Sequence, residues 1–103
     1  MKVQVSKVFA KFITKATGLA ARVETLPERA YRFFTGVDPY DADYYGDYDW
    51  ATGEYKAIVV TYPDGYYACP RYVTTKELSE EFKRRRIGTV EQLGEMLKDM
   101  LTI

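Results

Sequence analysis

The 103-residue sequence contains no histidine and only one cysteine, Cys69. Without histidine there is no Ser-His-Asp or Cys-His catalysis, no imidazole metal ligand and no usual general base near neutral pH. A single cysteine excludes an internal disulfide and a cysteine-based zinc site. The sequence also lacks the GxxxxGK[ST] and GxGxxG phosphate-binding loops. These absences predict a protein that is not an enzyme and that uses no cofactor.

Long apolar runs are absent as well, although apolar residues make up 47% of the sequence and charged residues 29%. This balance and this length are typical of one folded domain, residues 1–103. No apolar run approaches the roughly 20 residues needed to cross a bilayer. Lys7, Lys11 and Lys15 interrupt any signal-peptide core in the first segment. We therefore expect a cytoplasmic protein with no membrane partner.

The zero net charge, 15 basic against 15 acidic residues, conceals an uneven distribution. Residues 1–35 carry seven basic and two acidic side chains, a net charge of +5. Residues 36–70 carry one basic and seven acidic side chains, a net charge of −6, and residues 71–103 carry a net charge of +1. An asymmetry of this kind bears on the choice of partner more than the total charge does.

The order of sequence patterns predicts an α+β fold: an N-terminal helix, an antiparallel β-meander of three to five strands and a C-terminal helical hairpin. Apolar residues with helical spacing open the chain, and Gly18 supplies a left-handed cap that ends this helix. Lys7, Lys11 and Lys15 form a ladder on its solvated side. The opposite, apolar stripe consists of Val5, Val8, Phe9, Phe12, Ile13 and Ala16.

The segment after the first helix allows two interpretations. β-branched and aromatic residues favour two strands, at 20–25 and 29–34. A short helix after Thr25 is the competing interpretation, because Thr25 and Glu28 have the spacing of a capping box and Pro27 suits a first helical turn. We favour the two strands.

Two turn sequences, "YDWATGEY" and "TYPDGYY", predict an antiparallel meander with strands at 44–49, 54–62 and 66–73. In the second turn, Gly65 occupies the bulge position of a three-residue loop. The middle strand is apolar on both faces, so we expect it at the centre of the three. Pro70 cannot donate a ladder hydrogen bond, so we expect the last strand to be an edge strand or to be bulged at this position.

Two capped helices follow. Thr74 and Glu77 have the spacing of one capping box and Thr89 and Gln92 that of another, with Gly88 between the two helices. The apolar face of the last helix is predicted to contain Val90, Leu93, Met96, Leu97, Met100 and Leu101.

The segment "DPYDADYYGDYDW", residues 38–50, holds five carboxylates and five aromatic rings without one basic residue. Residues 41–52 fail as an EF-hand loop, because Tyr45 and Thr52 occupy two ligand positions. An irregular divalent site formed by Asp38, Asp41 and Asp43 stays open as an alternative. The acids are not organised as a buried catalytic pair, so we predict a recognition surface instead.

Tyrosine provides contact area at a low entropic cost and is enriched at protein interfaces. Carboxylates along such a surface can also occupy the positions of nucleic-acid phosphates in a basic groove. The predicted partner is therefore a protein, with a nucleic-acid-binding protein that has a basic groove as the favoured kind. The candidate partner-binding residues are Asp38, Asp41, Asp43, Tyr44, Tyr45, Asp47, Tyr48, Asp49 and Trp50.

The one basic cluster, "KRRR", supports an alternative function as a small DNA- or RNA-binding protein. Lys83, Arg84, Arg85 and Arg86 would contact phosphates, together with the lysines of the first helix. Two ordinary explanations compete. Cations complement the dipole at a helix C-terminus, and the pairs Glu80–Arg84 and Glu81–Arg85 have i, i+4 spacing. The last helix would also offer Glu91, Gln92, Glu95 and Asp99 to the phosphates, so direct nucleic-acid binding is the less favoured function.

A small α+β domain with no catalytic residues and the segment "DPYDADYYGDYDW" resembles, in style, the accessory proteins of phages and conjugative elements, of which anti-CRISPR and anti-restriction inhibitors are the best-known type. The resemblance implies an inhibitor or adaptor that acts on nucleic-acid-handling machinery. No signature motif is shared, so it assigns no role to any residue. DNA mimics of that type are strongly acidic, whereas this chain is neutral.

Overall fold

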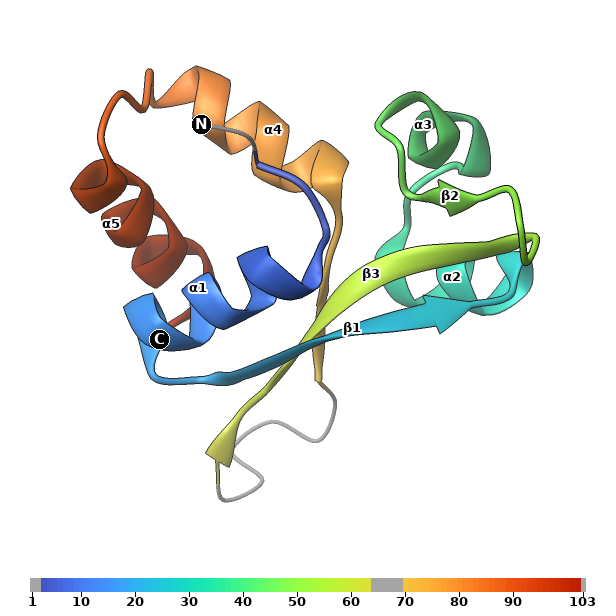
Figure 1. Ribbon diagram of the computed structural model, residues 1–103, viewed down its shortest axis with the longest axis horizontal. Helices are drawn as coiled ribbons and strands as arrows, with labels where there is room; N and C mark the ends of the chain where they lie inside the picture. Colours follow the sequence, from blue (N-terminus) through green and yellow to red (C-terminus); the bar gives the residue numbers. More distant parts are fainter. Residues whose placement is uncertain (1–2, 64–69, 103) are drawn as a thin grey trace.

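One central strand organises the chain in the computed structural model, which describes residues 3–63 and 70–102. The fold is α+β, as predicted: an N-terminal helix, a four-stranded antiparallel sheet and two C-terminal helices, with two further helices between the first two strands (Figure 1). In chain order the elements are α1 (Lys7–Thr17), β1 (Ala20–Leu26), α2 (Glu28–Thr35), α3 (Pro39–Tyr44), β2 (Tyr48–Asp49), β3 (Glu54–Thr61), β4 (Arg71–Val73), α4 (Thr75–Arg84) and α5 (Val90–Leu101).

Strand β3 is central, as its apolar character on both faces predicts. Strand β1 pairs along the whole of one edge, from Ala20 opposite Thr61 to Leu26 opposite Tyr55. The short strands β2 and β4 share the other edge, β2 near the start of β3 and β4 near its end. Strand β3 is therefore flanked by β1 on one side and by both β2 and β4 on the other. In a simple meander, β2 and β4 would lie on opposite sides of β3. Residues 64–69, which include Gly65 of the turn "TYPDGYY" and also Cys69, lie outside the described residues.

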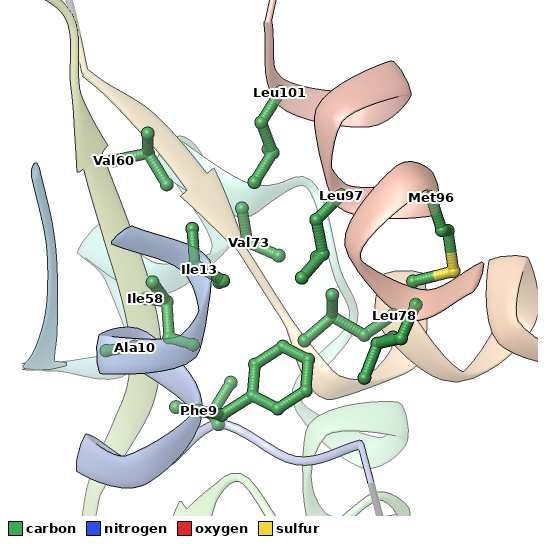
Figure 2. Packing of buried hydrophobic residues seen from close by; sticks show 12 residues of the cluster. Phe9, Ala10, Ile13, Ile58, Val60, Val73, Leu78, Met96, Leu97 and Leu101 are labelled. Atoms are coloured by element: carbon green, nitrogen blue, oxygen red, sulfur yellow. The ribbon is translucent and has the colours of Figure 1, made fainter. Parts of the chain in front are cut away.

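The larger core lies on one face of β3, under α1, α4 and α5. Ile58 and Val60 point into it because alternate residues of a strand face the same side. They pack with buried side chains of the helices, among them Ile13, Leu78 and Leu97 (Figure 2). Thr74 and Thr89 cap the N-termini of α4 and α5, and Gly18 ends α1 with a φ of 79°, as their sequences predict. Ser6 caps the N-terminus of α1.

Two residues of the predicted apolar stripes lie in solvent instead. Val8 of α1 and Val90 of α5 are both exposed, and Ala10 takes the buried place on α1. Val90 is the first residue of its helix, and the buried residues of α5 begin at Leu93. No helix among the described residues combines the length and the apolar character needed to span a bilayer.

The second, smaller core lies on the opposite face of β3, around Tyr55 and Ala57. The predicted strand at 29–34 is wrong: these residues belong to helix α2, so the competing helical interpretation was the better one. The helix begins after Pro27, while Thr25 stays in β1 and does not cap it. The intrinsic β-propensity of these residues is overridden because a helix buries Tyr31 and leaves its charged neighbours in solvent.

Replacement of Leu97 by alanine should lower the free energy of unfolding by about 2–5 kcal/mol, because it empties a fully buried position. The matched control is Val90→Ala in the same helix, where the side chain is exposed and we expect a change within about 0.5 kcal/mol. Urea denaturation of both variants measures the two values. Equal losses would place Val90 in the core and contradict the packing of α5.

Candidate interaction surface on α3 and β2

The acidic, aromatic segment does not form the predicted strand at 44–49. Its first half is helix α3, which Asp38 caps by accepting a hydrogen bond from the Tyr40 amide at 2.8 Å. Pro39 follows as the first helical residue, where its fixed φ suits a helix and its missing N–H costs nothing. Only Tyr48 and Asp49 pair with β3 as a strand. The Asp-Pro dipeptide is the signal that could have predicted this helix.

Asp47 is not part of the exposed surface, contrary to its inclusion among the partner-binding residues. The side chain is 1% exposed and its carboxylate accepts two hydrogen bonds from Thr75 at the start of α4, one from the amide at 2.9 Å and one from the hydroxyl at 2.6 Å. The Thr75 hydroxyl oxygen in turn accepts from the Val5 amide at 2.9 Å. Asp47 thus joins the segment after α3 to α4 and to the chain that leads into α1.

Asp41 has a partner as well. Its carboxylate forms an ion pair with Lys76 of α4, with 2.9 Å between Oδ2 and Nζ. Lys76 lies 35 positions further along the chain, so local sequence could not have predicted the pair. Asp49 accepts a hydrogen bond from the Ala51 amide at 2.9 Å, which is the turn role that the sequence suggested. Asp41, Asp47 and Asp49 therefore each have a partner within the fold, and Asp38 caps α3.

The exposed part of the segment is dominated by aromatic rings. Tyr40, Tyr44 and Trp50 are 79%, 77% and 78% exposed, although large aromatic side chains are usually well buried. Tyr40 was absent from the predicted partner-binding residues. Asp38, the cap of α3, and Asp43, within α3, are exposed as well. We define the acidic aromatic surface as Asp38, Tyr40, Asp43, Tyr44 and Trp50.

A hollow of about 260 Å³ opens within this surface. Tyr48 stands between two other rings, 4.9 Å from Trp50 in an edge-to-face arrangement and 4.8 Å from Tyr55. Tyr55 stacks in turn on the buried ring of Tyr31 at 4.9 Å. A continuous series of rings therefore connects the exposed surface to the smaller core. The hollow is lined by Pro39, Tyr40, Asp43, Tyr48, Trp50 and Tyr55.

The aspartates do not gather into a metal site. Within residues 3–63 and 70–102, no three or more carboxylate, histidine or cysteine side chains are placed so that they could hold a metal ion. Asp38 caps the helix, Asp41 is paired with Lys76 and Asp43 borders the hollow. The three side chains thus lie in three different local environments and do not form the divalent site that the sequence left open.

Two of the four side chains of the basic cluster at the end of α4 form ion pairs with neighbouring acids. Arg84 and Arg85 both bind Glu81, and Arg85 also pairs with Asp99 of α5 at 2.7 Å. Hydrogen bonds from the two arginines lower the pKa of Glu81 to about 2. The predicted pair Glu81–Arg85 is confirmed, whereas Arg84 pairs with Glu81 and not with Glu80. The other two members, Lys83 and Arg86, are exposed, as are Lys7, Lys11 and Lys15 of α1.

Comparison with models of protein families, with curated proteins and with solved structures found no match for this chain. The function is therefore inferred from the site alone.

Asp47 should give the folded protein an unusual response to acid. Burial raises the pKa of its carboxyl, against the opposing effect of the Thr75 hydrogen bonds. The folded state then binds the proton more readily than the unfolded state. Acidification towards the ordinary pKa of an aspartate therefore stabilises the folded state relative to the unfolded state. We expect the wild type to gain stability relative to Asp47→Asn as the pH falls from 7 towards 4.

Urea unfolding of both proteins at several pH values measures this difference. The difference between the two proteins at each pH gives the part of the pH dependence that requires the Asp47 carboxyl. A wild type that loses stability relative to Asp47→Asn on acidification would show that the Thr75 hydrogen bonds outweigh burial.

Proposed function

We propose that the protein is a non-enzymatic protein-binding module that acts through the acidic aromatic surface. In this proposal it works as an inhibitor or adaptor, of the type found in phages and mobile elements, on nucleic-acid-handling machinery. Its partner is a protein with a basic groove that normally holds a nucleic acid.

The observation that carries the proposal is the exposure of three large rings beside two exposed carboxylates. Tyr40, Tyr44 and Trp50 each leave more than three quarters of their surface in water. Tyrosine and tryptophan are the side chains that contribute most to binding energy in protein interfaces. Their placement on α3 and beside β2, over a packed series of rings, favours a surface that is formed before the partner arrives.

The two kinds of side chain would serve two stages of binding. Asp38 and Asp43 attract a basic groove over a distance and so raise the rate of encounter. The rings then lose their hydration in the complex and slow its dissociation. Carboxylates in a groove that normally binds phosphates would also exclude the nucleic acid, which is the inhibitory effect.

Direct binding of DNA or RNA is the weaker candidate. Two of the four side chains of the basic cluster are held by Glu81 and Asp99. A nucleic acid would have to displace these ion pairs to reach the guanidinium groups of Arg84 and Arg85.

The test uses the wild-type protein as bait in an extract of its source cell, with mass spectrometry of bound protein and analysis of bound nucleic acid. Kinetic binding measurements on the captured partner then compare variants. Asp43→Lys should lower the association rate, and the wild-type rate should fall as salt rises. Tyr44→Ala and Trp50→Ala should raise the dissociation rate about tenfold or more, a loss of about 1.4 kcal/mol or more in binding free energy.

The matched control for the ring variants is Phe33→Ala, which removes an equally exposed ring of α2 outside the acidic aromatic surface. It should bind as the wild type does. If the partner is a nucleic acid that is lost in Lys83→Ala and Arg86→Ala and retained in Tyr44→Ala, the proposed function is wrong.

A further inference from the structure

The aromatic hollow has a mainly aromatic lining. It is formed by Pro39, Tyr40, Asp43, Tyr48, Trp50 and Tyr55. Four of its six residues are aromatic, one is a carboxylate and none is basic. The ring planes of Tyr48 and Trp50 stand at 81° to each other and those of Tyr48 and Tyr55 at 46°. Ring planes therefore bound the hollow in more than one direction.

Of the described residues that line the hollow, the one that is charged is acidic. The face of an aromatic ring carries partial negative charge, and Asp43 adds a full charge at the border. The pKa of the Tyr55 phenol is raised above its ordinary value, and burial is the largest cause. The carboxylates of Glu28, Asp43 and Asp38 raise that pKa further. An anionic group is excluded by this charge, and a purely apolar group would leave Asp43 without a partner.

A cation fits both features, because it is attracted to ring faces and to the carboxylate. Between the two basic side chains, the planar guanidinium of arginine stacks on aromatic rings and donates two parallel hydrogen bonds to one carboxylate. The ammonium of lysine is a compact point charge that is more strongly hydrated. The combination of rings and one carboxylate therefore favours arginine.

We propose that the aromatic hollow binds the side chain of an arginine residue of the partner protein, with the guanidinium against the rings and hydrogen-bonded to Asp43. This inference rests on the proposed function and adds to it the chemical group that the surface recognises. A basic groove that binds phosphates presents such arginines, so a single side chain of the groove would anchor the complex.

The test needs no partner, because Trp50 is the only tryptophan of the chain and lies in the hollow. Its fluorescence is followed while Nα-acetyl-arginine amide is added to the wild-type protein. The matched ligand is Nα-acetyl-citrulline amide, which has nearly the same shape and no charge; Nα-acetyl-lysine amide compares the two cations. We expect saturable binding of the arginine amide, at least fivefold tighter than the citrulline amide and at least twofold tighter than the lysine amide.

Two variants locate the binding site. Asp43→Asn and Tyr40→Ala should each weaken the arginine amide at least threefold. Their matched controls are Glu91→Gln, which removes an exposed charge of α5, and Phe33→Ala, which removes an equally exposed ring of α2 outside the hollow. Both controls should bind as the wild type does.

Equal binding of the arginine and citrulline amides, or no saturable change with either, would overturn the inference. Tighter binding of the lysine amide would overturn the choice of arginine. If the arginine amide does not bind while capture of a protein partner still depends on Tyr44 and Trp50, this inference fails and the proposed function stands. If the arginine amide binds but no protein partner depends on the surface, the proposed function is the one that fails.

Discussion

The buried carboxylate of Asp47 is the interaction on which the rest of the arrangement depends. It accepts two hydrogen bonds from Thr75, whose hydroxyl oxygen accepts a third from Val5. The backbone of Asp47 adds a bond to Ala42 of α3 and another to Lys56 of β3. A buried carboxylate is costly unless it is hydrogen-bonded, so these partners must keep their places together. The segment before α1, helix α3, strand β3 and helix α4 are thereby joined through Asp47 and Thr75.

This connection holds α3 and β2 in place beside the larger core, and the acidic aromatic surface stands on them. The rings continue inwards from Trp50 through Tyr48 and Tyr55 to Tyr31, each within 5 Å of the next. The inner rings pack the smaller core and the outer rings lie in water. One continuous series of rings thus joins the smaller core to the exposed acidic aromatic surface.

Where local chemistry decides the structure, the sequence was enough. The caps at Thr74, Thr89 and Gly18 follow from short-range hydrogen bonding, and the central position of β3 follows from apolar character on both faces of a strand. Helix α2 was misjudged because burial of Tyr31 overrides the β-propensity of its neighbours. The roles of Asp47 and Asp41 depend on Thr75 and Lys76, about 30 positions away along the chain. No local pattern could separate these two structural acids from the exposed Asp43.

Native-state hydrogen exchange tests most directly whether the acidic aromatic surface is held in place by Asp47. The Thr75 amide donates to the Asp47 carboxylate, and the Asp47 amide donates to Ala42. We expect both amides to exchange as slowly as those of Ile58 and Val60 in β3, through global unfolding only. Fast exchange of the Thr75 and Asp47 amides while β3 stays protected would show that α3 and β2 open on their own, and that Asp47 does not hold the surface in place.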